Sequence, residues 1–138
     1  MKLGIEEIRY INALQNIAGV HARDCIISAD RITFLVSDQQ ISKAIGKNGA
    51  TIKIVKKKIG KEVELFEYSK DVKKFMERAM NRIKIDNMDL VEMEGKKTLK
   101  IALNSENRRK LMQNSGRFRK VKEIVERNYN IPAIKVTG

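Results

Sequence analysis

The sequence has very few of the residues on which most enzymes and most secreted proteins depend. Its 138 residues include one cysteine, one proline, one histidine and no tryptophan. A single cysteine, Cys25, cannot form an internal disulfide, which is typical of a cytoplasmic protein. The lone histidine, His21, leaves little from which to build a histidine-based metal site or a catalytic triad. We therefore expect a cytoplasmic protein that is not an enzyme and that needs neither a metal ion nor a cofactor.

Long apolar runs and nucleotide-binding signatures are also missing. The first nine residues mix charged and apolar side chains where a signal peptide needs an apolar stretch. No run approaches the roughly 20 apolar residues that cross a bilayer. No Gly-Lys pair is followed by Ser or Thr as in a Walker A loop, and G-x-G-x-x-G does not occur. These absences argue against a membrane-spanning protein and against the common nucleotide-binding folds.

Positive charge is present in excess, and it is concentrated in two windows. The chain has 29 basic and 17 acidic residues, for a net charge of +12. Residues 38–61 carry seven basic residues and one acidic residue, and residues 105–122 carry the same numbers. The two windows account for the whole excess, whereas an ordinary solvated surface would spread its charge. Such patches predict a polyanionic partner, either nucleic acid or an anionic membrane surface.

The first half of the chain alternates between helical and strand spacing. Isoleucines three residues apart predict an amphipathic helix that ends at Gly19, and period-two apolar residues then predict a β-hairpin. A short helix follows, with Asp38 suited to its N-cap and with Ile41, Ala44 and Ile45 facing the core. After an interruption, a second helix ends at Gly60 and an alternating strand closes the half. The two helices are expected at 38–45 and 50–59.

The second half repeats this order at a spacing of about 66 residues. A helix reaching Ile83 precedes a hairpin that turns at Gly95, and a short helix at 105–111 is followed by a loop at 112–115. A longer helix stops at Asn130, and the last strand begins near the only proline. We therefore expect an α+β fold with two domains, each a three-stranded sheet packed against helices. The expected domains are residues 1–68 and 69–138.

The interruption in the first half has the sequence Gly46-Lys47-Asn48-Gly49, at the centre of a basic window. Glycines allow positive φ and carry no side chain, so a phosphate group can approach the main chain. The loop also opens the N-terminus of a helix, where N–H groups favour anions. Lys47 adds a point charge, and Asn48 tolerates the left-handed region. A tight loop between two helices is where a KH domain grips a nucleic-acid backbone, so this loop is predicted to clamp phosphate groups.

The residues expected to contact the nucleic acid surround this loop, with lysines for phosphate and isoleucines for the bases. They are Gly46, Lys47, Asn48, Gly49, Ile45, Ile52, Lys43, Lys53 and Lys56. In the second half, Met112-Gln113-Asn114-Ser115 occupies the matching position without glycines, so the clamp is degenerate there. Basic side chains could still hold a strand by charge in that half. The candidates are Arg108, Arg109, Arg117 and Arg119.

Three features together resemble archaeal NusA-like transcription termination and antitermination proteins. They are the stretch from Ala44 through Gly49 to Ile52, the closing segment 61–68, and the tandem arrangement. The resemblance implies two type II KH domains, binding of single-stranded RNA such as a nascent transcript, and a role in termination or antitermination. The family's RNA-gripping glycines fall on Gly46 and Gly49. Bacterial NusA also has a polymerase-binding region and an RNA-binding barrel that nothing in this sequence could encode. Any association with RNA polymerase is therefore expected to be indirect.

Two other interpretations fit the same sequence. A KH protein of ribosome assembly or RNA processing would share the loop and the charge. A basic adaptor between proteins would instead turn its charged faces towards an acidic partner. No aromatic pair marks the stacking platform of an RRM, and no helix-turn-helix or zinc module favours double-stranded DNA. A salt-dependent shift with short RNA, absent with an acidic protein, would separate RNA binding from the adaptor function.

Overall fold

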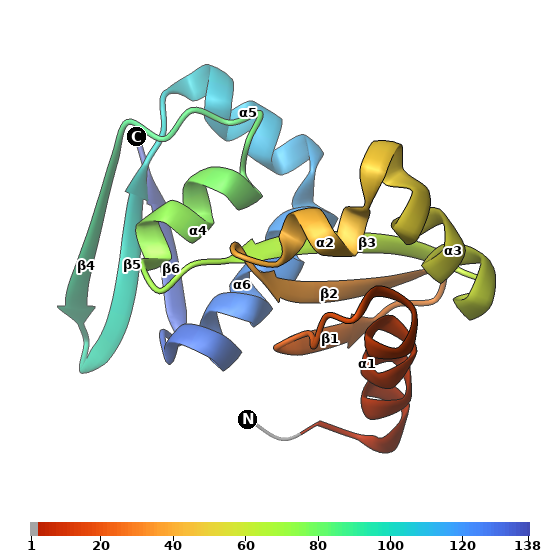
Figure 1. The fold of residues 1–138 in the computed structure, drawn as a ribbon. Helices are drawn as coiled ribbons and strands as arrows, with labels where there is room; N and C mark the ends of the chain where they lie inside the picture. The colour runs from red at the N-terminus through yellow and green to blue at the C-terminus, as the bar shows by residue number, and fades with distance from the viewer. Residues whose placement is uncertain (1–2) are drawn as a thin grey trace. The chain divides into compact units, whose positions relative to one another are not determined.

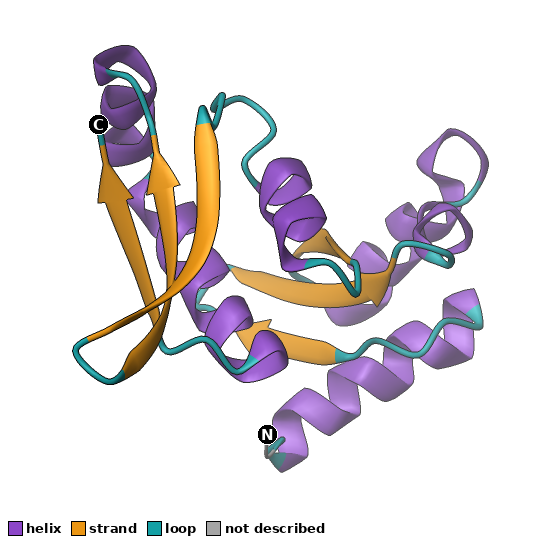
Figure 2. Cartoon of the chain, turned by 90° about the vertical axis from the view of Figure 1, so that its left-hand side faces the viewer, coloured by secondary structure: helices purple, strands orange, loops and turns teal. Residues whose placement is uncertain are grey.

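The computed structural model describes residues 3–138 and divides the chain into two compact units, residues 1–69 and residues 70–138 (Figure 1). Each unit holds one three-stranded sheet with helices (Figure 2). The expected α+β fold is confirmed at this level. Within the described residues, no helix is long and apolar enough to cross a membrane.

The first unit builds one core from helices and a mixed sheet. The strands follow the order β1-β2-β3, with β1 antiparallel to β2 and β2 parallel to β3. Buried residues of the sheet and of three helices form a single cluster that includes Leu14, Phe34, Ala44 and Val55. The elements are α1 (Ile5–Ala18), β1 (Asp24–Ile27), β2 (Arg31–Ser37), α2 (Ile41–Ile45), the 3₁₀ turn η1 (Lys47–Gly49), α3 (Ala50–Ile59) and β3 (Glu62–Tyr68).

Glycines end the two long helices of this unit as predicted. Gly19 after α1 and Gly60 after α3 both adopt the left-handed conformation, and each donates its N–H to a carbonyl four residues earlier. Left-handed glycine is the commonest helix end because it satisfies late carbonyl groups without a Cβ clash. The predicted helix 50–59 is confirmed at both ends.

The second unit repeats the order of elements. Its sheet has the order β4-β5-β6, again with an antiparallel first pair and a parallel second pair. Asn104 caps α5 by accepting the N–H of Asn107, and Asn130 ends α6 at φ 57°. The elements are α4 (Val72–Ala79), β4 (Asn87–Met93), β5 (Lys96–Ala102), α5 (Ser105–Gln113), α6 (Ser115–Tyr129) and β6 (Ala133–Thr137).

Two predictions about the first unit were wrong in detail. Helix α2 begins at Ile41 rather than at residue 38, and Asp38 is not its N-cap. The N–H of Asp38 instead donates to the carbonyl oxygen of Tyr68 at 2.9 Å, which extends the pairing of β2 and β3 beyond their ends. Ile45, predicted to face the core, is 39% exposed. Ala44, also predicted to face the core, is fully buried, so this part of the prediction is confirmed.

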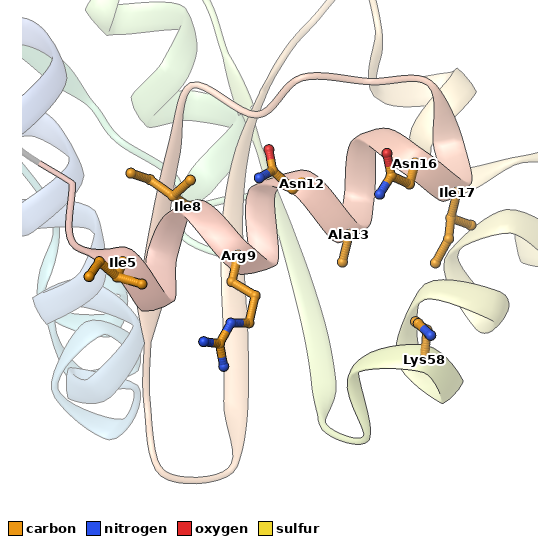
Figure 3. A pocket seen from close by; sticks show the side chains of 8 residues that line it. All are labelled: Ile5, Ile8, Arg9, Asn12, Ala13, Asn16, Ile17 and Lys58. Carbon is orange, nitrogen blue, oxygen red and sulfur yellow. The ribbon is translucent and has the colours of Figure 1, made fainter.

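The amphipathic face of α1 also differs from the simplest prediction. Ile11 is buried, but Ile5 and Ile8 are 79% and 46% exposed. Both line an open hollow of about 460 Å³ that runs along α1 to Lys58 of α3 (Figure 3). The buried residues of α1 are Ile11, Leu14 and Ala18. The N-terminal part of the helix, which carries Ile5 and Ile8, therefore faces away from the core.

In the second unit, the predicted loop at 112–115 is not a loop. Helix α5 continues through Gln113 and α6 starts at Ser115, so Asn114 alone joins them. Helix α4 ends at Ala79 rather than reaching Ile83. The reason is tertiary: Arg117 donates its Nε–H to the carbonyl oxygen of Ala79 at 2.9 Å, which satisfies a terminal carbonyl group without a further turn of helix.

Candidate nucleic-acid interface

The loop between α2 and α3 has a backbone that few sequences could adopt. Three of its four residues have positive φ: Gly46 at 77°, Asn48 at 54° and Gly49 at 76°. Asn48 and Gly49 lie in the left-handed helical region, which asparagine and glycine tolerate best. Gly46 has ψ 171°, which places it in a region that is essentially closed to other residues. The residue types that suggested the loop are therefore those its conformation requires.

Gly46 is also required by space. A Cβ at this position would lie 2.7 Å from the backbone nitrogen of Thr51 and would collide with the Thr51 side chain. At Gly49 the nearest atom to such a Cβ is Cγ2 of Ile52, at an ordinary 3.9 Å. The main chain at Gly46 thus packs directly onto the first turn of α3, whereas Gly49 is constrained only by its backbone conformation. Thr51 was not among the predicted site residues, and no sequence signal singles it out.

Hydrogen bonds close the loop into a turn that starts the helix. The N–H of Gly49 donates to the carbonyl oxygen of Gly46 at 3.1 Å, and the N–H of Ala50 donates to that of Lys47. The Lys47 and Asn48 amides precede these bonds, at the end of the helix where N–H groups lack intrahelical partners. Both side chains are exposed. The turn therefore presents main-chain donors, a lysine and an amide at the positive end of a helix, an arrangement suited to an anion.

The three flanking lysines differ in what they contact. Lys53 is exposed, one turn into α3. Lys56 is half-buried and forms an ion pair with Glu62 at 3.5 Å. Lys43 lies against the end of α1, since a Cβ at Gly19 would be 3.2 Å from its Nζ. A cation there favourably meets the negative end of the α1 dipole. Lys53 is thus the flanking lysine whose contacts leave it most suited to a ligand.

Apolar surface lies beside the same loop. Ile45 precedes Gly46 and is 39% exposed, while Ile52 is half-buried one turn after the loop. A partly exposed isoleucine next to this turn offers an apolar surface that an unstacked base could cover. The two isoleucines and the loop come from consecutive segments, so the structure brings this part of the predicted site together.

The second unit has no equivalent loop. Asn114, the single residue between α5 and α6, has φ −123°, and Gly116 already lies inside α6. The four predicted arginines of this unit fall in different places. Arg117 bonds the end of α4 through Nε, and the Arg108 guanidinium lies beside the backbone of Gly138. Arg109 and Arg119 are exposed on α5 and α6.

The fold and the loop together define a class of protein: a helix–strand–strand–helix–turn–helix–strand unit with a glycine-bounded turn. The model of one family, described as KH domain, matches residues 7–110. The chain is similar to proteins named "Probable transcription termination protein NusA" from two archaea. It is 33% identical to that of Methanocaldococcus jannaschii over 99% of this chain and 75% of the relative. It is 24% identical to that of Thermoplasma acidophilum over 95% and 92%.

The fold is also similar to that of a solved structure. The crystal structure of APE1850 superimposes with a TM-score of 0.81 at 26% identity, covering 97% of this chain and 99% of that one. The chain belongs to the KH domain family and, within it, to the archaeal NusA-like proteins.

Proposed function

We propose that this protein binds single-stranded RNA by clamping its backbone at Gly46-Lys47-Asn48-Gly49. The observation that carries the proposal is the Gly46 backbone, held at φ 77° and ψ 171° against Thr51 at the start of α3. A main chain without a side chain, next to the positive end of a helix, lets a phosphate group come close to N–H donors. The family to which the chain belongs recognises nucleic acid through such a loop.

The residues around the turn then have separate roles. Lys47 and Lys53 neutralise phosphate groups, and the Asn48 amide donates to or accepts from phosphate and ribose oxygens. Ile45 and Ile52 contact bases that are displaced from the stack by the docked backbone. Lys43 and Lys56 act at longer range, because one lies at the end of α1 and the other is paired with Glu62.

We further propose that residues 1–68 and 69–138 are two type II KH domains and that the second has a degenerate clamp. Two units with the same element order and the same mixed sheet support this division. The exposed Arg109 and Arg119 would add charge along the strand. Arg108 and Arg117, which already contact protein groups, would contribute less.

The biological role we propose is non-enzymatic action in transcription termination or antitermination, on the nascent transcript. The support is the printed name of the archaeal relatives together with the RNA-binding geometry of this chain. Association with RNA polymerase would be indirect, through the transcript. Crosslinking to native transcripts tests this role: recovery of nascent transcript ends supports it, and recovery of ribosomal RNA precursors would favour the ribosome-assembly alternative.

The simplest test of the biochemical activity compares partner classes. Short single-stranded RNA should shift the electrophoretic mobility of the protein, and this shift should depend on salt. An acidic protein with a net charge similar to that of the RNA should cause no such shift. Binding of the acidic protein alone would support the adaptor function instead.

A further inference from the structure

A second cavity lies in the other unit, at the place where α4 ends and α5 meets α6. Its volume is about 570 Å³, within the range of small-molecule sites in proteins. The wall on one side is the segment 80–83 that follows α4, and the wall on the other side is the α5–α6 junction. The eight lining residues are Met80, Asn81, Arg82, Ile83, Lys110, Gln113, Asn114 and Arg117.

The lining has the chemistry of a nucleotide site. Three of the eight residues are cationic, three carry side-chain amides, two are apolar, and none is acidic. Arg82 is exposed, whereas Lys110 pairs with Glu106 and Arg117 donates its Nε–H to the carbonyl oxygen of Ala79. Amide groups can donate to and accept from the edge of a base, while arginine can hold a phosphate group by two parallel hydrogen bonds.

Apolar side chains lie next to the cavity. A narrow recess of about 20 Å³ shares four lining residues with it, namely Met80, Ile83, Asn114 and Arg117. Beyond these, the recess is lined by Ala79, Leu111, Phe118 and Val121. The recess is too small to admit a base. Because Met80 is buried and Ile83 is half-buried, Ile83 supplies the apolar surface that a base in the main cavity could contact. Contact of an unstacked base with apolar and aromatic side chains is a general means of holding single strands.

We propose that this cavity binds one unpaired nucleotide of the RNA strand, with its phosphate group on Arg82 and its base against Ile83. The inference rests on the proposed RNA-binding function and adds a second, structurally different contact to it. The α5–α6 junction has no positive-φ residue and cannot cradle a backbone as Gly46 does. The second unit would therefore hold the strand by enclosing a nucleotide rather than by clamping its backbone.

Arg82→Glu tests the charge component, and Lys96→Glu is its matched control. Both residues are exposed in the same unit, and both substitutions change the net charge equally, but Lys96 begins β5 and does not line the cavity. Affinity for a single-stranded RNA of about 12 nucleotides is measured at one salt concentration. Loss of one charge-assisted contact predicts that Arg82→Glu weakens binding about tenfold more than Lys96→Glu does. Equal losses in the two variants would overturn the inference while leaving RNA binding intact.

A photocrosslinking measurement distinguishes an enclosed base from a purely electrostatic contact. Wild-type protein is irradiated with the same RNA carrying 4-thiouridine, and crosslinked peptides are identified by mass spectrometry. Crosslinks to residues 80–83 or 113–118 are expected in addition to those near Gly46. Crosslinks confined to residues 43–56 would contradict the cavity inference but would leave the proposed binding at the turn intact. If wild-type protein binds no RNA in either experiment, the proposed function fails and the cavity inference fails with it.

Discussion

Gly46 and Gly49 are the same residue type at the two ends of one turn, yet their surroundings make different demands. Gly46 combines a backbone conformation open only to glycine with direct packing against the Thr51 nitrogen. Gly49 needs a left-handed conformation, but a Cβ there would make only an ordinary contact with Ile52. The first glycine therefore maintains the packing at the start of α3, whereas the second is required mainly by the conformation of the turn.

This difference predicts unequal effects on stability. Gly46→Ala should lower the free energy of unfolding by about 2–3 kcal/mol, because it adds steric overlap to a strained conformation. Gly49→Ala should cost about 1 kcal/mol, the usual penalty for a left-handed alanine. Urea denaturation of the two variants provides the measurement. Equal losses would show that Thr51 does not limit the space at Gly46.

At the scale of single side chains, the sequence predicted which residues form the loop better than it predicted what the basic side chains contact. The glycines, Asn48 and Lys47 lie as the chemistry of the loop suggested. Lys43 and Arg117 belong to the basic windows, but both approach the C-terminal end of the first helix of their own unit. Nothing in a one-dimensional pattern places the end of α1 or α4 next to a basic side chain. The division of the cations into exposed side chains and side chains that contact protein groups therefore required the fold.

The elements themselves were predictable wherever a local signal was decisive. Helix α3 and the helix ends at Gly19, Gly60 and Asn130 follow from apolar spacing and left-handed termination, and these were confirmed. The errors arose where tertiary contacts decide. Asp38 resembles an N-cap, but its amide pairs with Tyr68 of the neighbouring strand. Residues 112–115 were expected to form a loop because the first half has one, but without positive-φ residues the two helices simply abut at Asn114.

The contrast between the two helix junctions predicts different roles for the two halves. Replacing Arg109 and Arg119 by alanine removes two exposed cations and leaves the turn at residues 46–49 unchanged. Affinity should fall by a similar factor for every single strand, and the log–log salt slope should become shallower by about 1.4. Gly49→Val, which distorts the turn but leaves all charges, should instead reduce the preference among sequences.

A panel of short RNAs measured at one fixed salt concentration, on both variants, separates these outcomes. Circular dichroism controls for folding of the glycine variant, since valine is disfavoured in the left-handed region. If the arginine variant lost sequence preference and the glycine variant kept it, the roles assigned to the two junctions would be reversed.

For the molecule as a whole, the net charge of +12 sets the expected dependence on salt. The basic windows are partly neutralised within their own units, because Lys56 pairs with Glu62 and Lys110 pairs with Glu106 at 3.7 Å. Exposed ion pairs of this kind are weak and are screened by salt. In the proposed function, the charge excess attracts a strand from a distance, and the turn at Gly46 sets where its backbone docks.

Binding of short single-stranded RNA should weaken steeply as salt is added. About four phosphate contacts in one clamp predict a log–log slope near −3, since each contact on a single strand contributes about −0.7. A longer strand that also reaches the second unit should give a steeper slope. Titrations at several salt concentrations measure both values. A flat response would mean that phosphate contacts do not drive the association.

The central claim is that the turn at residues 46–49 holds the RNA backbone, and one comparison of affinities tests it most directly. Lys47→Asp with Asn48→Asp places two carboxylates at exposed positions of the turn, without altering a core residue. Lys58→Asp with Asn12→Asp makes the same chemical changes in the same unit, at exposed positions along the α1 hollow. We predict that the turn variant loses most of its affinity for a short single-stranded RNA, that the control loses far less, and that both keep the circular dichroism of the wild type. Equal affinities for the two variants would show that RNA binding depends on charge alone and that the turn is not a clamp.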